Sequence, residues 1–319
     1  MTAVVSLGSL NIDRIRSVDA AELEALEADA DWLPAPGETR LVPELPHAAL
    51  AAATETALGG KGANQAVAAS LAGASTSLLG AVGADQDEGA LLPSLRESGV
   101  DVDRVAIRDR PTGTALILVD GNGENRIALR PGSNATVDRD YVEAQARWIT
   151  GADCLLVQNE IPVEATRAAL DVVAAAQDPP TVVLDPAPAH GAPPLVTADP
   201  VDVITPNADE ARRLADHLLD VDATVITTNG PDPVEVAGPE HRTVPPPSVH
   251  PVDTTAAGDV FAGYLAAGIA ESGSWEPGLE RAIAAASLST KTPGAQPSIP
   301  DADAVRRFLG RVGPLSTGH

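Results

Sequence analysis

The stretch DTTAAGDVFAG, residues 253–263, leads into an apolar helical pattern and keeps its side chains small where that helix begins. A helix start presents unpaired backbone N–H groups, and the run AAG at 256–258 leaves them unobstructed, so they could close on a phosphate oxygen. Asp259 follows in the first turn, where its carboxylate could accept a proton. The alternative is an ordinary helix capped by Thr254 or Thr255, with Asp259 favourable to the helix dipole.

A second glycine-rich stretch, GGKGANQAVAASLAGA at 59–74, also precedes a helical pattern. It is not a P-loop, because Gly62 rather than Ser or Thr follows the lysine. It is not GxGxxG either, because Gln65 occupies the position of the third glycine. Lys61 and Asn64 are polar groups that could reach a small polar ligand, and the alternative is a tight strand-to-helix turn without a ligand.

Further polar residues follow apolar runs that are typical of strands. Asn11 and Asp13 stand in GSLNID, and Glu160 ends LLVQNE. Because ligands of α/β sheets bind beyond the carboxyl ends of the strands, these side chains are candidate contacts. In TPNADEA, Asn207 and Glu210 lie three residues apart on one face of a helix start, where they could hold a hydrated Mg²⁺ or a phosphate. Asn followed by Glu at this spacing also matches a capping box, which needs no ligand.

These candidates need a scaffold, and the chain alternates short β-type runs, such as AVVSL, DCLLVQ, TVVLDP and TVITT, with Ala-rich helical patterns. Such alternation predicts parallel βαβ units, and hence an α/β domain with helices on both faces of one sheet. Two segments, 14–50 and 111–130, break the pattern, and the second carries a hairpin signal, GNGE, between TALILVD and NRIALR. We expect both segments to form a small β lid within a single domain, 1–319; the alternative is two unrelated surface excursions.

Composition excludes several classes of partner. The chain has 319 residues, of which 45 are acidic and 21 are Lys or Arg, and the resulting net charge of -24 argues against nucleic acid. Only two of the bases are lysines, which predicts adaptation to a salt-rich cytosol that screens self-repulsion; the alternative is an ordinary acidic protein. The single cysteine, Cys154, is expected to be a buried structural thiol. The sequence shows neither a signal peptide nor a membrane-spanning run, so we expect a soluble cytoplasmic protein without a membrane partner.

Taken together, the motifs GSLNID, PGET, GGKGANQAVAAS, VGADQDEG, PTGTALILVDGNGENRI, TPNADEA, VDTTAAGDVFAG and GAQPS resemble, in content and order, the ribokinase branch of the PfkB carbohydrate-kinase family. The resemblance runs from Leu7 to Pro300. It implies a ribokinase-like, doubly wound three-layer α/β/α domain with a small β-sheet lid, and ATP-dependent phosphorylation of a sugar hydroxyl. Asp259 then matches the catalytic base, and the anion hole for the γ-phosphoryl group matches Ala256, Ala257 and Gly258.

The resemblance also implies roles for the other candidates. Contacts to sugar hydroxyls match Asn11, Asp13, Gly60, Lys61, Asn64, Glu160 and Asp259. Contacts to the nucleotide and its Mg²⁺ match Asn207, Glu210, Thr228, Gly230 and Gly258. A monovalent cation, with K⁺ as the expected ion, matches Asp253, Thr255, Ser289, Thr292, Gly294 and Ser298. The partners implied are a small-molecule sugar, a nucleotide and a second copy of the chain in a homodimer formed through the lid.

Two positions depart from the family's pattern. The nucleotide loop, usually T-L-G-x-x-G, is TNGPDP here, with Pro233 where the second glycine is expected. Ile283 stands where ribokinases often carry His. Because proline fixes φ and lacks a donor N–H, the first change bears on nucleotide preference.

The leading hypothesis is transfer from ATP to D-ribose, which yields D-ribose 5-phosphate. Alternatives on the same scaffold act on ribose 1-phosphate, a nucleoside, 2-keto-3-deoxygluconate or fructose. A phosphorylated acceptor would need basic groups near the lid, for which Arg126 and Arg130 are candidates unless both are exposed hairpin charges. A non-catalytic sugar-binding protein is an alternative of another class, against which the intact AAGD run argues. A dinucleotide-binding oxidoreductase would carry GxGxxG after the first strand, which is absent here.

Overall fold

The computed structural model describes residues 3–29, 31–36, 38–85, 88–121, 125–237 and 241–315. Its largest element is a nine-stranded sheet with the strand order β16-β15-β14-β13-β12-β11-β1-β5-β7. In chain order these strands are β1 Ala3–Leu7, β5 Ser75–Leu79, β7 Val100–Asp101, β11 Cys154–Gln158, β12 Thr181–Asp185, β13 Val203–Ile204, β14 Thr224–Asn229, β15 Asp232–Ala237 and β16 Arg242–Val244.

The strands from β14 to β7 pair in parallel, as the alternating pattern predicts. The edge strands β15 and β16 are instead antiparallel to their neighbours. The reason is local: only Gly230 and Pro231 separate β14 from β15, which is enough for a hairpin and far too little for a crossover helix.

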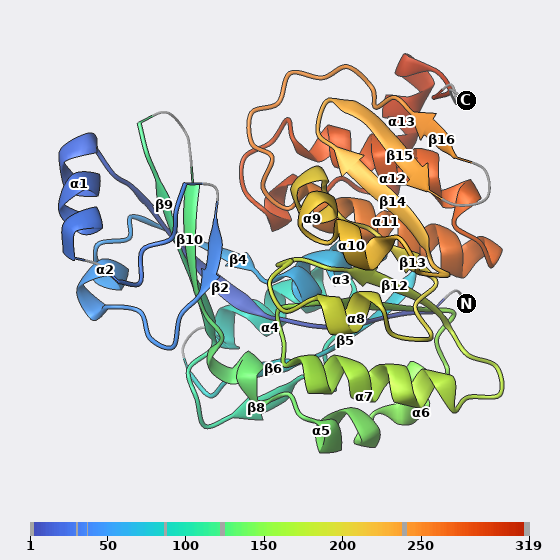
Figure 1. Ribbon diagram of the computed structural model, residues 1–319, viewed down its shortest axis with the longest axis horizontal. Helices are drawn as coiled ribbons and strands as arrows, with labels where there is room; N and C mark the ends of the chain where they lie inside the picture. Colours follow the sequence, from blue (N-terminus) through green and yellow to red (C-terminus); the bar gives the residue numbers. More distant parts are fainter. Residues whose placement is uncertain are drawn as a thin grey trace.

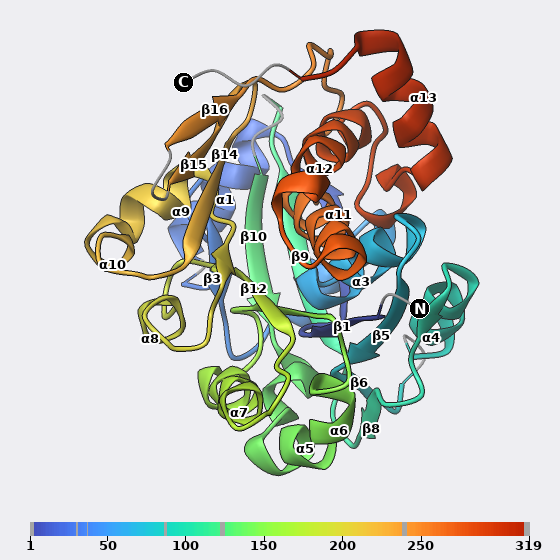
Figure 2. The ribbon, with the colours of Figure 1, turned by 90° about the vertical axis from the view of Figure 1, so that its right-hand side faces the viewer.

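Helices cover both faces of this sheet (Figures 1 and 2). One face carries α3 Lys61–Leu71, α4 Glu88–Glu97, α11 Ala257–Ser272, α12 Glu276–Ser289 and α13 Ala302–Val312. The other carries α5 Arg139–Ala144, α6 Ala146–Ile149, α7 Val163–Ala174, α8 Pro193–Val196 and α10 Ala215–Leu218, with α9 Ala208–Arg213 just before α10. Alternate residues of a strand serve the two layers: Val4 packs with α3 and α11, and its neighbour Val5 packs with α7. The central strands β11 and β12 are therefore mostly apolar and almost wholly buried, as expected where a sheet is covered on both faces.

A five-stranded second sheet, here called the lid sheet, stands beside the main domain (Figure 1). Its order is β3-β10-β9-β2-β4, with β2 Asn11–Ser17, β3 Thr39–Leu41, β4 Glu55–Gly59, β9 Gly113–Val119 and β10 Asn125–Arg130. The predicted hairpin strands are β9 and β10, and their turn, beyond Gly121, lies outside the described residues. Strand β4 was missed, because its run follows directly from a helical pattern and falls outside both segments assigned to the lid.

The two faces of the lid sheet have different neighbours. Along β9, Leu116 and Leu118 pack outward under α1 Ala20–Asp29 and α2 His47–Ala51, in a small core of their own. The alternating residues Ala115 and Ile117 face a cavity next to the main domain. The predicted three-layer α/β/α domain with a β-sheet lid is thus confirmed.

The remaining elements are a pair of short strands, β6 Ala81–Gly83 and β8 Ala106–Arg108, and two turns of 3₁₀ helix, Gly132–Thr136 and Gln296–Ser298. Cys154 is fully buried in β11, and burial raises the pKa of its thiol, so it is an unreactive core residue. Across the ranges given above, no helix has the length and apolar character needed to cross a bilayer.

Candidate active site

A cavity of about 400 Å³ lies between the lid sheet and the starts of α3 and α11. Apolar lid residues, Ala115, Ile117, Ile127 and Leu129, line one side of it. Most of the predicted site residues line the rest: Asn11, Asp13, Gly60, Lys61, Asn64, Glu160, Asn207, Thr228, Gly230, Thr255, Ala256, Ala257, Gly258 and Asp259. Topology explains the position, because loops at the carboxyl ends of parallel strands form the ligand crevice in such sheets.

Helix α11 begins without a side-chain cap, which argues against the alternative of an ordinary helix capped by Thr254 or Thr255. Its N-cap, Ala256, has φ 60° and ψ 9° and is the only non-glycine with a positive φ in the described part of the chain. Such a left-handed residue stores on the order of 1–3 kcal/mol of strain and is most often found at functional sites. Within the described ranges, no group accepts a hydrogen bond from the amides of Ala256, Gly258 and Asp259. The amide of Ala257, the third predicted member of the anion hole, instead donates to the Thr254 carbonyl at 3.2 Å. A Cβ on Gly258 would meet no atom within 4 Å, so the space at this helix start is open.

Asp259 is buried beside these amides and is held by side chains of α3. Its Oδ2 accepts a hydrogen bond from Asn64 Nδ2 at 3.0 Å. Its Oδ1 accepts from Gln65 Nε2 at 3.2 Å and lies 3.5 Å from Lys61 Nζ. The carboxylate therefore points into the protein and lines the cavity instead of facing bulk solvent.

Two residues of this network, Asp185 and Gln65, are absent from the predicted site. Asp185 ends β12 and accepts hydrogen bonds from Gln65 Nε2 at 2.8 Å and Lys61 Nζ at 3.2 Å. Its burial raises its pKa to about 7 against the opposing effect of Lys61. Burial lowers the pKa of the Lys61 amine, but the carboxylates of Asp185 and Asp259 overcome that effect and raise it. The position of Asp185 at a strand's carboxyl end is the same signal that identified Glu160, so the run TVVLDP contained enough information to include it.

The predicted sugar contacts form an acidic wall of the cavity. Glu160 Oε2 accepts hydrogen bonds from Ser9 Oγ at 2.5 Å and from the Lys61 backbone amide at 3.2 Å. Burial raises the pKa of Glu160, and burial together with the charges of Glu160 and Asp259 raises the pKa of Asp13 to about 7. Gly60, with φ 92°, allows the chain to pass close by: a Cβ there would lie 2.7 Å from the Asn11 amide nitrogen.

The arginines considered for a phosphorylated acceptor are engaged elsewhere. Arg126 binds Glu27 and the Pro34 carbonyl, and Arg130 donates to Thr114 Oγ1. Neither lines the cavity, whose one cationic side chain within the described ranges is Lys61.

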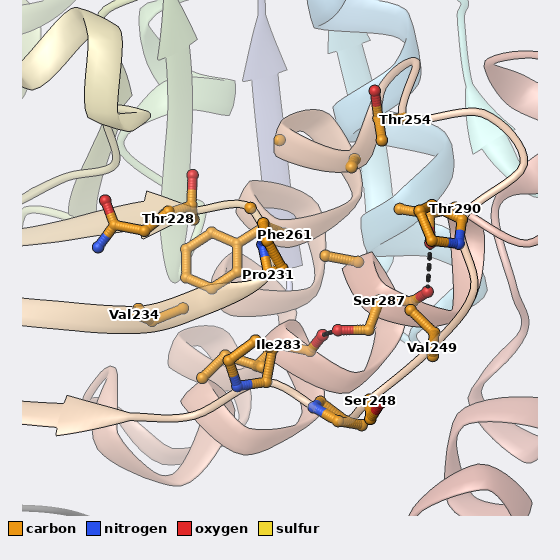
Figure 3. Close-up of a pocket in the computed structure, with 18 residues that line it drawn as sticks. Thr228, Pro231, Val234, Ser248, Val249, Thr254, Phe261, Ile283, Ser287 and Thr290 are labelled. Atoms are coloured by element: carbon orange, nitrogen blue, oxygen red, sulfur yellow. Dashed lines mark hydrogen bonds between the residues drawn. The ribbon is translucent and has the colours of Figure 1, made fainter.

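A second, apolar pocket of about 380 Å³ adjoins the cavity and shares Thr228, Gly230, Thr254, Ala257 and Gly258 with it. Phe261, Val234 and Ile283 surround it in Figure 3. The hydroxyls of Ser287 and Thr290 donate to the carbonyls of Ile283 and Ser287, so they are engaged within α12 and its end. This pocket, beside the open start of α11, suits a flat apolar group.

Pro233 does not line either pocket. It lies exposed in β15, close to the register shift between β14 and β15, and its carbonyl accepts a hydrogen bond from Asn229 Nδ2 at 2.7 Å. Its missing N–H therefore falls at an irregular part of the ladder, where proline is tolerated. Pro231, at the hairpin turn, lines the apolar pocket instead.

Asn207 and Glu210 form the capping box that the sequence left open as an alternative. Asn207 Oδ1 accepts from the amides of Asp209 and Glu210, both at 2.9 Å, and Glu210 Oε2 accepts from the Asn207 amide at 2.9 Å. Asn207 lines the cavity and Glu210 does not. No group of three or more metal-ligating His, Cys, Asp or Glu side chains converges among the described residues. Mg²⁺ commonly takes one carboxylate together with waters and substrate phosphates. Glu210 Oε1 accepts no hydrogen bond within the described ranges, so it is available as that single carboxylate ligand.

The predicted monovalent-cation residues come from two loops that meet next to α11. Asp253 Oδ1 accepts from the Thr255 amide and hydroxyl, at 2.9 and 2.6 Å, and Asp253 Oδ2 accepts from the Gly294 amide at 2.8 Å. Partial burial opposes ionisation, but these hydrogen bonds lower the pKa of Asp253. Ser289 and Ser298 are buried and donate to nearby carbonyls, so their oxygens keep lone pairs for a cation. The amide of Thr292 closes the turn on Ser289.

Known proteins share this architecture. The Bacillus subtilis ribokinase is 34% identical over 294 residues, which cover 89% of this chain and 95% of the relative. A bifunctional ribokinase/ribose-5-phosphate isomerase A of Fructilactobacillus sanfranciscensis is 31% identical over 98% of this chain, which spans only 57% of that relative's length.

Among solved structures, a Thermotoga maritima ribokinase matches with a TM-score of 0.78 and 30% identity, and the match covers 97% of this chain and 100% of that one. The Arabidopsis thaliana ribokinase complexed with ribose and ATP matches with a TM-score of 0.74 and 26% identity, over 96% and 98% of the two chains. The model of the pfkB family carbohydrate kinases matches residues 1–302. The chain therefore belongs to the pfkB carbohydrate-kinase family and is a phosphotransferase that acts on a sugar hydroxyl.

Proposed function

We propose that the protein transfers the γ-phosphoryl group of ATP to D-ribose and forms D-ribose 5-phosphate. The observation that carries this proposal is the buried Asp259 carboxylate next to the open, uncapped start of α11, in one cavity with the polar side chains of the sugar candidates. The Arabidopsis relative complexed with ribose and ATP supports both the sugar and the nucleotide.

In the proposed reaction, the sugar hydroxyl gives its proton to Asp259 as its oxygen attacks the γ-phosphorus, and the bond between the γ-phosphorus and the β,γ-bridging oxygen breaks to release ADP. The free amides of Ala256 and Gly258 stabilise the negative charge of the phosphoryl group in flight. Asn11, Asp13, Gly60, Lys61, Asn64 and Glu160 bind the sugar hydroxyls. A wrong sugar leaves one of these buried groups unpaired, which gives discrimination. The apolar pocket of Figure 3 takes the adenine ring, with Thr228 and Gly230 at the phosphates.

The charge of the cavity favours a neutral sugar over ribose 1-phosphate. Asp13, Glu160 and Asp259 line it, and Lys61 is its one cationic side chain among the described residues. The phosphate group of ribose 1-phosphate would face these carboxylates at short range, in a buried site where like charges repel strongly. We therefore expect ribose to be preferred over ribose 1-phosphate.

The bound nucleotide requires Mg²⁺, which supplies charge neutralisation at the phosphates, and Asn207 and Glu210 are its proposed protein neighbours. A K⁺ ion bound through the loops of Asp253 and Gly294 would fix the start of α11.

We further propose a cytoplasmic homodimer that pairs through the lid sheet, in a salt-rich cytosol. Equilibrium ultracentrifugation tests the dimer, and thermal unfolding against KCl concentration tests the salt adaptation: full stability in dilute buffer would contradict it.

The decisive experiment is a survey of phosphate acceptors in high KCl, with ADP release measured for ribose, deoxyribose, fructose, 2-keto-3-deoxygluconate, ribose 1-phosphate and nucleosides. The highest kcat/KM is expected for ribose, with product phosphorylated at its 5-hydroxyl. Replacement of KCl by NaCl in the same assay tests the K⁺ requirement. Sugar binding without turnover of any acceptor would instead favour a non-catalytic binding protein, and a higher kcat/KM for another acceptor would overturn the ribose assignment.

A further inference from the structure

Asp259 shares its hydrogen-bond donors with a second buried carboxylate, Asp185. The Lys61 ammonium lies 3.2 Å from Asp185 Oδ2 and 3.5 Å from Asp259 Oδ1. The Gln65 amide nitrogen lies 2.8 Å from Asp185 Oδ2 and 3.2 Å from Asp259 Oδ1. One ammonium and one neutral amide thus bridge two acids that would otherwise repel each other.

The Gln65 amide can bridge the acids in one orientation only. An ionised carboxylate accepts hydrogen bonds and cannot donate, so both acids require the NH₂ end of Gln65. Its Oε1 then faces Gln158 Nε2 at 2.7 Å, which fixes the amide of Gln158 as well. Gln158 Nε2 also lies 3.5 Å from Ser6 Oγ, and Ser6 Oγ donates to the Gly62 carbonyl at 2.9 Å.

Bulk water does not reach this chain, because Gln65, Gln158 and Ser6 are each 0% exposed. The backbone also makes room for it: a Cβ on Gly8 would come within 1.7 Å of Gln158 Oε1. A buried polar chain that ends on the two acids is costly unless each amide keeps its direction.

We propose that Gln65, oriented by Gln158, is a positioning residue that aims the Asp259 carboxylate by bridging it to Asp185. This inference rests on the proposed function, in which Asp259 is the base. Gln65 does not line the cavity, so it acts through Asp259 and does not touch the substrate. Its neutrality matters as much as its geometry, because the amide binds both acids without adding charge.

Other charged groups also face this pair. Lys61 comes from α3, Asp13 from the lid strand β2 and Glu160 from the loop after β11, while Glu210 in the first turn of α9 acts on Asp185 and Lys61. The substitution Gln65→Glu leaves all of them in place and adds one carboxyl group. The three clustered carboxyl groups repel one another, so the Asp259 carboxylate should lose the direction that the neutral amide gives it.

The test uses protein labelled with ¹³C at aspartate side-chain carboxyls, with the Asp259 resonance assigned by its loss in Asp259→Asn. In Gln65→Glu, the Asp259 carboxyl resonance at a fixed pH is expected to shift, because this carboxylate loses a hydrogen bond that it accepts. We expect kcat to fall at least about tenfold with little change in the KM for ribose. The matched control Gln177→Glu, at an exposed position after α7, makes the same charge change and should change none of these quantities. An unshifted Asp259 resonance in a folded Gln65→Glu protein would overturn the inference.

Gln158→Met is the second variant, should Gln65→Glu not fold. Its side chain is similar in length but cannot donate to Gln65 Oε1, so the Gln65 amide loses its fixed direction. The Asp259 resonance should again shift, and an unshifted one counts against the inference. The resonance needs no substrate, so it decides the positioning role even if no sugar is phosphorylated, which would sink only the proposed function.

Discussion

Three helices begin at the edge of the same cavity, and two of them, α9 and α11, have first turns that are built in opposite ways. At α9, Asn207 and Glu210 cap each other's amides and satisfy the helix start from within the chain. At α11, the N-cap is a strained alanine and no side chain caps the first turn. Because unpaired amides near a buried site need a partner, the open start is suited to an anion that the chain itself does not supply. The contrast favours α11 over α9 as the anion-binding helix start, because its uncapped amides lie beside the buried Asp259 carboxylate.

The largest expected effect comes from Asp259, the buried carboxylate in the first turn of α11, which has no buried counterpart in α9. Asp259→Asn keeps the shape of α11 but removes the proton acceptor, so kcat should fall by about 10²- to 10⁴-fold while sugar affinity changes little. Steady-state kinetics and sugar titration by calorimetry measure the two quantities. The exposed control Asp171→Asn should leave both unchanged, and a near-normal rate for Asp259→Asn would remove the main reason to read α11 as catalytic.

The carboxylates of Asp13 and Asp259 are buried, whereas that of Glu210 in α9 is only partly buried. For Asp13, this burial can be measured as a pH dependence of stability. Burial, Glu160 and Asp259 raise its pKa to about 7 from the usual 3.8, so the folded protein keeps this proton where the unfolded chain has lost it. The free energy of unfolding should therefore fall as pH rises between these two values and be flat above the upper one.

Asp13→Asn should remove that contribution, so between pH 4 and pH 7.5 the variant should lose on the order of 4 kcal/mol less stability than wild type does. Urea unfolding at several pH values measures it. The same pH dependence in both proteins would show that Asp13 is not held in its neutral form.

Closing the open helix start should cost activity without costing stability. Gly258→Leu places a side chain in space where Gly258 has no neighbour within 4 Å, and it replaces glycine by a better helix former. We expect the KM for ATP to rise at least about tenfold, since one charge-assisted hydrogen bond is worth about that much. The melting temperature should hold or increase. A variant that binds ATP as tightly as wild type would place the phosphates elsewhere.

The smallest effects come from the caps themselves, and they should have opposite signs. Asn207→Ala removes a working cap and should lower the free energy of unfolding by about 1 kcal/mol. Ala256→Gly relieves the left-handed strain and should raise it by about 1 kcal/mol with turnover retained. Chemical denaturation measures both. Asn207→Asp restores the cap, so lost activity in a stable Asn207→Asp protein would assign Asn207 a role at the phosphates beyond capping.

Local patterns predicted much of this molecule. The run AAGD and the motif GGKGANQ lie at the starts of α11 and α3, and both border the cavity as the pattern required. Asn207 and Glu210 left two readings open, because a capping box and a phosphate site use the same residues at the same spacing. Strand β4 and the antiparallel edge were missed, since the choice of partner strand depends on contacts distant in the chain.

By itself, the sequence determined the elements and the residue types at their ends, because periodicity, small residues and caps act over a few neighbours. Only the tertiary structure decided that Asp185 and Asp259 share one lysine and one glutamine, although Gln65 and Asp185 are 120 positions apart in the sequence. It also decided that Pro233 lies away from the apolar pocket proposed for the nucleotide and that Arg126 is engaged with Glu27. The physical reason is that the direction of a buried amide or charge follows from the groups that surround it, and those groups are brought together only by the fold.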